Sequence, residues 1–237
     1  MTSPAPDDAS SPSTAVLFDI DGTLVDSNFA HVDAWSRAFT DVGHAVDSWR
    51  IHRSIGKDSS LLVEGLVGKD AAARLLDDAK DAHSRHYAEH LGDEGDLHVF
   101  ERATDLLAEL ARRGHGVVLA TSAPEDELKA LRGLLDVEDA LWAVTSSEDV
   151  ETAKPDPGIV EVALAKADVS AERAVMVGDA VWDVEAAHRA GVTCVGVLSG
   201  GFSRAELVEA GAEEVYDDVA DLLARLDDSV IGRLGRD

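Results

Sequence analysis

The sequence of 237 residues has one cysteine, few aromatic side chains and no long apolar run. A single cysteine excludes an intrachain disulfide bond, and Cys194 lies in an apolar stretch that predicts a buried strand. No segment approaches the roughly 20 apolar residues that a membrane-spanning helix needs, and no basic stretch followed by an apolar one indicates a signal peptide. We therefore expect a cytoplasmic protein with no membrane partner.

Positive charge is also scarce. The chain has 21 lysines and arginines against 47 aspartates and glutamates, which gives a net charge of −26 at pH 7. Such a surface repels phosphate backbones and argues against a nucleic-acid partner. A small phosphorylated ligand is still compatible, because a bound divalent cation and a nearby lysine reverse the field locally. The sequence leaves the oligomeric state open.

Paired aspartates stand at the end of the first apolar run. Residues Ala15–Phe18 predict a strand buried on both faces of a parallel sheet. Asp19 and Asp21 follow this strand, and alternation along an extended chain would point both side chains in one direction. Gly22 and Thr23 then predict a turn. Such carboxylates lie where open α/β sheets bind ligands, and a cation would offset their repulsion.

A second pair of aspartates follows a second predicted strand, Ala174–Gly178. Asp179 ends that strand, and Asp183 comes four residues later in a predicted helix. A helix that begins near Ala180 would make Asp179 its N-cap and place Asp183 one turn inward. Turn or cap roles would account for each pair alone, but not for two strands that both end in paired carboxylates. Mg²⁺ prefers such oxygen ligands.

Hydroxyl groups and a lysine follow two further predicted strands. Gly116–Ala120 leads into Thr121 and Ser122, at the start of a predicted helix, where free backbone N–H groups favour anions. Leu141–Thr145 is followed by Lys154 in a loop that neighbouring prolines stiffen. Each of these residues alone is typical of a helix cap or a solvated surface. The order of all four elements, each after a strand, favours a single site.

Four motifs in this order resemble those of the haloacid dehalogenase superfamily: Asp19-x-Asp21-Gly22-Thr23, Thr121-Ser122, Lys154-Pro155 and Gly178-Asp179-x-x-x-Asp183. The resemblance extends from about Ala15 to the C-terminal helix. It is greatest for the phosphatase branch with a small helical cap, which is similar to phosphoglycolate phosphatases and to β-phosphoglucomutase. It implies an α/β fold, with a Rossmann-like parallel-sheet core and an inserted α-helical cap.

The resemblance also implies roles for the motif residues. Asp19 would be the nucleophile that becomes an aspartyl phosphate, and Asp21 the general acid and base, with a pKa raised by nearby anions. We predict catalytic roles for Asp19, Asp21, Thr121 and Lys154. We predict contacts with phosphate or substrate for Ser122, Gly22, Thr23 and His31. We predict that Mg²⁺ is bound by Asp19, Asp21 (through its backbone carbonyl), Asp179 and Asp183.

The stretch after Ser27 predicts a helical insertion. No convincing strand appears before about Gly116, and amphipathic segments occupy the interval. These segments are Phe29–Val42, Ser59–Val67 and Ala71–Leu91. The interval is too long for a structureless loop. We predict a disordered tail at residues 1–13, a core formed by 14–27 and 97–237, and a helical cap at 28–96.

Two side-chain patterns stand out within the predicted cap. Trp35 and Phe39 lie four residues apart, and we predict that they form the apolar stripe of the first cap helix. His83, His86 and His90 recur at helical spacing, which could chelate a metal. No carboxylate or cysteine completes an obvious ligand set, so we predict that these histidines lie on a solvated helix face.

Three alternatives to a phosphatase, two enzymes and one non-enzymatic protein, are disfavoured by the residues present. A hydrolytic dehalogenase would use Asp19 but would need neither a proton from Asp21 nor Mg²⁺. A phosphonatase needs a cap lysine, and the candidates Lys57, Lys69 and Lys80 lie in no recognisable context. A non-enzymatic binding protein would lack part of the catalytic set, and none of it is missing.

A sugar-phosphate mutase is the nearest alternative. His31 lies twelve residues after Asp19, near the entry to the cap, where β-phosphoglucomutases also carry a histidine. Such mutases place a lysine directly before a cap glycine, whereas here Ile55 precedes Gly56. We therefore predict a Mg²⁺-dependent phosphatase that acts on a small phosphorylated metabolite.

Overall fold

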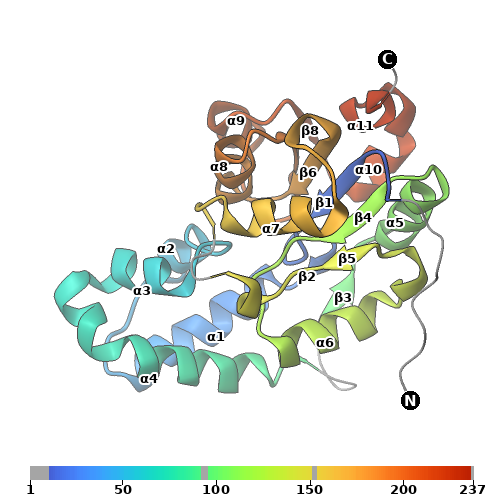
Figure 1. The fold of residues 1–237 in the computed structure, drawn as a ribbon. Helices are drawn as coiled ribbons and strands as arrows, with labels where there is room; N and C mark the ends of the chain where they lie inside the picture. The colour runs from blue at the N-terminus through green and yellow to red at the C-terminus, as the bar shows by residue number, and fades with distance from the viewer. Residues whose placement is uncertain (1–10, 92–95, 151–153, 236–237) are drawn as a thin grey trace.

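The computed structural model describes residues 11–91, 96–150 and 154–235. A parallel sheet with helices on both faces forms one part of the molecule, and a group of four helices lies beside it (Figure 1). Residues 1–10 of the predicted tail and residues 92–95, next to the predicted end of the cap, lie outside the described residues. Among the described residues, no helix is both long and apolar enough to cross a membrane.

Six strands form the parallel sheet in the order β5-β4-β1-β6-β7-β8. They are β1 (Ala15–Phe18), β4 (Gly116–Leu119), β5 (Ala143–Val144), β6 (Ala174–Gly178), β7 (Thr193–Val197) and β8 (Glu214–Tyr216). The chain builds the sheet outward from β1, first toward β5 and then toward β8. The direction of building therefore reverses between β1 and β6, which is where such sheets bind ligands. The predicted Rossmann-like α/β core is confirmed.

The central strands end level with one another. Phe18 in β1 is paired with Leu119 in β4 and with Val177 in β6. The residues that follow these strands therefore emerge at the same edge of the sheet. This register brings together segments that are more than a hundred residues apart in the sequence.

Helices cover both faces of the sheet, and short 3₁₀ turns connect some of the elements. One face carries α5 (Ala103–Arg112), α6 (Glu125–Leu135), α10 (Val219–Ala224) and α11 (Val230–Arg233). The other carries α7 (Gly158–Ala167), α8 (Val181–Arg189) and α9 (Arg204–Ala210). The 3₁₀ turns are Glu138–Ala140, Ser147–Asp149, Ala171–Arg173 and Leu226–Asp228.

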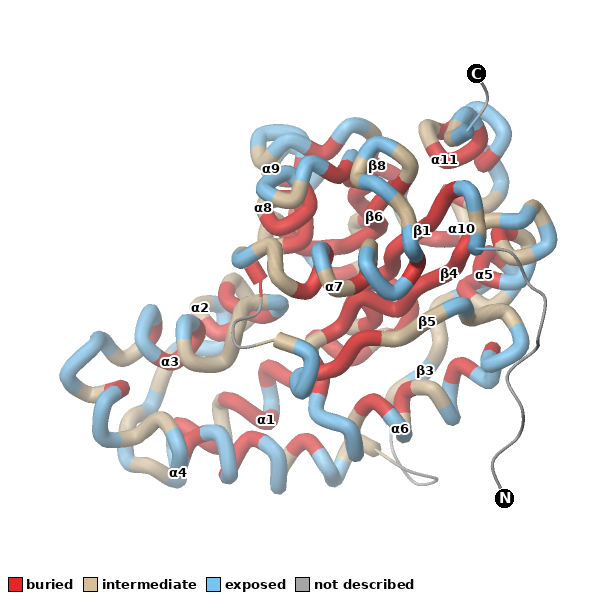
Figure 2. Tube along the Cα trace, viewed as in Figure 1, coloured by how far each residue is buried: buried red, intermediate tan, exposed pale blue. Residues whose placement is uncertain are grey.

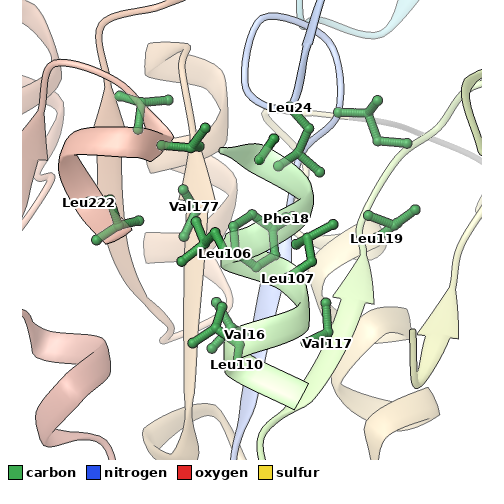
Figure 3. Close-up of a cluster of buried hydrophobic side chains, with 14 of the residues drawn as sticks. Val16, Phe18, Leu24, Leu106, Leu107, Leu110, Val117, Leu119, Val177 and Leu222 are labelled. Atoms are coloured by element: carbon green, nitrogen blue, oxygen red, sulfur yellow. The ribbon is translucent and has the colours of Figure 1, made fainter. Parts of the chain in front are cut away.

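The strands are buried because both of their faces are apolar. Val16 and Phe18 point into one core cluster, while Ala15 and Leu17 point into the other, as the alternation of side chains along a strand requires. Figure 3 shows Val16 and Phe18 of β1 packed against leucines of α5. Figure 2 shows the same pattern over the whole chain, with buried strands inside and exposed outer faces of helices.

The four helices beside the sheet form an apolar core of their own. They are α1 (Asn28–Asp41), α2 (Ser48–His52), α3 (Ser59–Val67) and α4 (Lys69–Tyr87), which we call the cap. Trp35 and Phe39 are both buried in this core, so the predicted apolar stripe of the first cap helix is confirmed. The pattern missed α2, because five residues are too few to show a helical period.

A two-stranded antiparallel ribbon connects the sheet to the cap. In this ribbon β2 (Val25–Asp26) pairs with β3 (His98–Val99). The expectation that no strand lies between Ser27 and about Gly116 is therefore wrong. A strand of two residues is too short for apolar and polar positions to alternate visibly, so the pattern did not reveal β3.

Truncation of Leu107 tests the core between α5 and the sheet. This side chain is fully buried, and Leu107→Ala should lower the free energy of unfolding by about 2–5 kcal/mol, because apolar contacts are lost and a cavity remains. Leu134→Ala is the matched control, because Leu134 is 40% exposed on α6, and it should cost about 0.5 kcal/mol or less. Urea unfolding of both variants measures the difference. Equal losses would contradict this account of the core.

Candidate active site

The residues predicted to form a site converge at the edge of the sheet where the central strands end. Asp19 follows β1, Thr121 comes two residues after β4, and Asp179 follows β6. Lys154 reaches the same place from the loop between β5 and α7. All four side chains are buried. The level strand ends explain this convergence. Asp19 follows β1 and Asp179 follows β6, and these two strands pair and end at the same edge of the sheet.

Lys154 lies between two carboxylates. Its ammonium group donates a hydrogen bond to Asp19 Oδ1 and forms an ion pair with Asp183 Oδ1, at 2.7 Å. Asp179 lies on the other side of Asp19, and carboxylate oxygens of Asp19, Asp179 and Asp183 all lie within 4.8 Å of one another. Three buried carboxylates thus lie together with one ammonium group, which contacts two of them, and negative charge is left uncompensated.

Burial and mutual repulsion change the pKa values in this group. Burial raises the pKa of Asp19 to about 7, with Asp183 adding to the rise and Lys154 opposing it. Burial and the charge of Asp183 raise the pKa of Asp179 well above its ordinary value. For Lys154, burial opposes the charged form, but Asp183 and Asp19 outweigh it and raise the pKa. A cation bound among these carboxylates would favour their ionised forms.

The surroundings of Asp179 are shaped to hold its carboxylate in place. Its oxygens accept hydrogen bonds from Thr23 Oγ1 at 3.1 Å and from Asn28 Nδ2 at 3.0 Å. The backbone of Gly200 passes so close that a Cβ atom there would overlap the Asp179 carboxylate. Asn28 Oδ1 is buried and has no hydrogen-bond partner among the described residues. Clustered hard oxygen donors of this kind fit a divalent cation such as Mg²⁺.

Asp183 also caps the helix on which it lies. Its Oδ2 accepts a hydrogen bond from the backbone N–H of Ala180, at 3.0 Å, while Oδ1 faces Lys154. Ala180, not Asp179, is the N-cap of α8, so the expected capping role of Asp179 is wrong. The difference arises because the carboxylate of Asp183, inside the first turn of α8, accepts the hydrogen bond from the backbone N–H at the start of the helix. Asp179 therefore remains free to face Asp19.

Gly22 and Thr23 lie behind Asp179. Thr23 is fully buried and uses its hydroxyl on Asp179, and Gly22 has a φ of 76° where a Cβ atom would meet Asn28 and Asp179. A cavity lies between the site and the cap. Among the described residues that line it, neither Gly22 nor Thr23 occurs. Their predicted contact with phosphate stays a prediction.

Asp21 belongs to a different group from the three clustered carboxylates. Its Oδ1 accepts a hydrogen bond from Ser27 Oγ at 2.5 Å and faces His31 Nε2 at 3.4 Å. His31 Nε2 also lies 3.7 Å from Glu127 Oε1 on α6. The side chain of Asp21 therefore groups with His31 and Glu127, and a role in metal binding through its backbone carbonyl stays a prediction.

The expectation that nearby anions raise the pKa of Asp21 is wrong. Burial does raise it, but the charge and hydrogen bond of His31 and the hydroxyl of Ser27 outweigh burial and hold the pKa below its ordinary value. The sequence does not show that these two residues meet Asp21. The pKa of His31 is raised in turn, because Asp21 and Glu127 outweigh the effect of its burial.

A cavity of about 360 Å³ lies between these groups and the cap. On the core side it is lined by Asp19, Asp21, Thr121, Ser122, Glu127 and Lys154. On the cap side it is lined by His31, Trp35, Ile55, Gly56, Lys57, Asp58, Ser59, Leu62, Lys80, His83 and Ser84. The cavity therefore has polar groups on both sides. Two lysines that were considered for phosphonatase chemistry, Lys57 and Lys80, belong to its cap wall.

Thr121 begins the turn that leads from β4 into α6. Its Oγ1 accepts a hydrogen bond from the backbone N–H of Ala123, at 3.0 Å, and its own N–H donates to Thr145 Oγ1 at 3.0 Å. These contacts hold the turn at the cavity wall. Ser122 lies between them and lines the same cavity.

The cap contacts the core around the cavity. The backbone N–H of Asp58 donates to the carbonyl oxygen of Lys154 at 2.9 Å, and His52 Nε2 lies 3.0 Å from the carbonyl oxygen of Gly200. The ammonium group of Lys57 lies 3.9 Å from the centre of the Trp182 ring. The cap is thus seated on the same loops that carry the buried charges.

The three cap histidines do not share a solvated face. His83 is buried and lies 3.1 Å from His31, Nε2 to Nδ1, so the expectation of a solvated face is wrong for this residue. His86 contacts Asp41, and His90 lies beyond the end of α4. Within the part of the chain that is described, the three rings form no common metal site. Helical spacing did not reveal that α1 packs over His83.

The comparisons with known proteins agree with this geometry. The family model of haloacid dehalogenase-like hydrolases matches residues 14–191. The chain belongs to this family. It is 34% identical over 214 residues to a phosphoglycolate phosphatase of Rhodospirillum rubrum, with 88% of each chain covered. It is 31% identical over 235 residues to the protein CbbY of Cereibacter sphaeroides, with 90% of this chain and 96% of that protein covered.

Solved structures of this family share the fold. A hydrolase from Pseudomonas syringae superimposes with a TM-score of 0.83 at 32% identity, covering 91% of this chain and 99% of that one. CbbY from Rhodobacter sphaeroides in complex with phosphate superimposes with a TM-score of 0.72 at 25% identity, covering 91% and 99%. The predicted class, a superfamily phosphatase that acts on phosphoric monoesters, is confirmed.

Substitution of Gly200 tests the seat of Asp179. In Gly200→Ala the new Cβ would overlap the Asp179 carboxylate and displace it, so we expect Mg²⁺ affinity to fall roughly tenfold or more. Gly65→Ala is the control, because a Cβ at Gly65 meets open space on α3. Calorimetric titration with Mg²⁺ measures both variants. Unchanged affinity in Gly200→Ala would show that Asp179 does not bind the cation.

Proposed function

We propose that the protein is a Mg²⁺-dependent phosphatase that hydrolyses a small phosphorylated metabolite through an aspartyl-phosphate intermediate. The observation that carries this proposal is the group of three buried carboxylates with Lys154, of which Asp19 and Lys154 line the cavity. A purely structural cluster would pair its charges, because uncompensated buried charge is costly. Excess negative charge beside a cavity is what a cation and a transferred phosphoryl group require.

Asp19 is suited to attack phosphorus. Lys154 holds its Oδ1, and this contact leaves the second oxygen for the substrate. Attack would form an acyl phosphate on Asp19 and break the bond between phosphorus and the leaving oxygen. Lys154, Thr121 and Ser122 would then stabilise the oxygens of the transferred group.

Asp21 is suited to move the proton. The substrate phosphate would bring negative charge beside it and so favour its protonated form. Asp21 would donate this proton to the leaving oxygen and accept one from the water that attacks the aspartyl phosphate. His31 and Ser27 hold the carboxyl group in place for both steps.

Mg²⁺ fits the carboxylates of Asp19, Asp179 and Asp183. When bound, it would neutralise charge on the transferred phosphoryl group. Asp183 also orients Lys154, so it serves the phosphoryl oxygens as well as the cation.

The cavity favours a small substrate with a second anionic group. Its volume suits a metabolite, and Lys57 and Lys80 supply positive charge on the cap wall opposite Asp19. Several relatives are named phosphoglycolate phosphatases. Phosphoglycolate, with a carboxylate and a phosphate, is therefore the first substrate to test in a panel of phosphomonoesters.

Asp19→Asn, together with metal removal, tests the mechanism. The substitution preserves shape but removes the nucleophile, so we expect phosphate release to fall on the order of 10³-fold or more. Chelation should abolish turnover, and added Mg²⁺ should restore it. Asp77→Asn, on an exposed position of α4, is the control and should retain wild-type turnover. Near wild-type turnover in Asp19→Asn, or in the chelated enzyme, would refute the mechanism.

A sugar-phosphate mutase is the second candidate, because His31 lies beside Asp21 at the entry to the cap. A mutase must shield its aspartyl phosphate from water and hold a sugar phosphate in two orientations, for which cap cations matter. Ile55 lines the cavity before Gly56, where mutases carry a lysine. With glucose 1-phosphate and its bisphosphate activator, we expect free phosphate to exceed isomerised sugar. Isomerisation faster than phosphate release would favour the mutase.

A further inference from the structure

Two buried histidines of the cap form a chain that ends at Asp21. His83 on α4 and His31 on α1 lie 3.1 Å apart, from Nε2 of His83 to Nδ1 of His31. The other ring nitrogen of His31 faces Asp21 Oδ1 at 3.4 Å and Glu127 Oε1 at 3.7 Å. These contacts thus link α4, the last helix of the cap, to the carboxylate of Asp21 in the core.

Aromatic neighbours fix the planes of both imidazole rings. His31 stacks on Tyr87, with ring centres 3.9 Å apart and planes 5° apart. His83 stacks on Trp35 at 4.3 Å and 22°. Stacking holds the planes, but it does not distinguish a ring from the same ring turned over. The hydrogen bond between the two histidines supplies that distinction, because a ring flip would replace Nδ1 of His31 by a carbon.

The contact also determines where His31 carries a proton. If His83 donates to His31 Nδ1, the proton of a neutral His31 must lie on Nε2. If His83 accepts instead, Nδ1 of His31 carries a proton. A His31 that also donates to Asp21 through Nε2 then carries protons on both nitrogens. In the first arrangement, and in the second when His31 is protonated, Nε2 presents a hydrogen to the ionised carboxylate of Asp21.

We propose that His83 is a positioning residue that orients His31, so that its Nε2–H is held on Asp21 when the cap is seated on the core. The consequence for catalysis rests on the proposed phosphatase function, in which Asp21 moves the proton. His83 also lines the cavity, so direct contact with the substrate is the competing explanation.

Replacements of His83 separate these explanations. His83→Phe keeps a ring between Trp35 and Tyr87 but has no nitrogen. His83→Gln keeps a polar atom near the position of Nε2, whereas the shorter His83→Asn does not reach it. We expect kcat to fall roughly tenfold in His83→Phe and His83→Asn with KM changed less than twofold, and His83→Gln to restore most of the loss. His86→Gln, one turn along α4 and bonded to Asp41, is the control and should be unchanged.

A double-mutant cycle tests whether His83 acts through His31. In a His31→Gln background, His83→Phe should cause no further loss of kcat, because the group that it orients is already absent. Losses that multiply would show that His83 acts on the substrate directly and would overturn the proposal. Equal losses in His83→Gln and His83→Phe would also overturn it, since packing alone would then explain the effect.

An NMR measurement makes the test independent of activity. Imidazole ¹⁵N spectra, recorded above the titration of His31, should show its proton on Nε2 in the wild type and in His83→Gln. In His83→Phe both tautomers should be populated. An unchanged His31 tautomer in His83→Phe would refute the proposal even in an active enzyme. If the wild type hydrolyses no phosphomonoester but the tautomer shifts as expected, the proposed function fails and the positioning role of His83 stands.

Discussion

The buried ammonium group of Lys154 holds the site together. It lies between the carboxylates of Asp19 and Asp183, while Asp179 completes a group with more negative than positive charge. Burial of these charges costs free energy that the surrounding core must offset. Packed helices on both faces of the sheet provide that core. The excess charge is therefore held by the surrounding fold, and of this charged group Asp19 and Lys154 line the cavity.

The parts of the fold that follow from local pattern could be predicted. β1, β4 and β6 are runs of four or five buried residues, and runs of that kind are typical of strands covered on both faces. Asp19 and Asp179 then follow from topology, because residues just after parallel strands share one edge of the sheet. The order of the strands determines which of these residues lie side by side, and this order comes from the structure.

The parts that depend on contacts between distant segments could not be predicted. His83 looked like a surface residue, because nothing in the period of α4 reveals that α1 covers it. Glu127 belongs to no motif, yet α6 carries it to within reach of His31. The predicted direction of the pKa shift of Asp21 was wrong for the same reason, since its partners His31 and Ser27 come from outside the motif. Such charges depend on tertiary packing and leave no mark in sequence spacing.

The connection between Asp21 and the cap is short. Between Asp21 and His31 the chain passes only through β2 and the first turn of α1. His31 therefore belongs to α1 of the cap, while Asp21 belongs to the loop that follows β1 of the sheet. Glu127 belongs to the core and His83 to the cap. The two ring nitrogens of His31 therefore contact different parts of the molecule. The contact between His31 and Asp21 thus joins the seated cap to the core, and it is the contact that the proposed positioning by His83 would maintain.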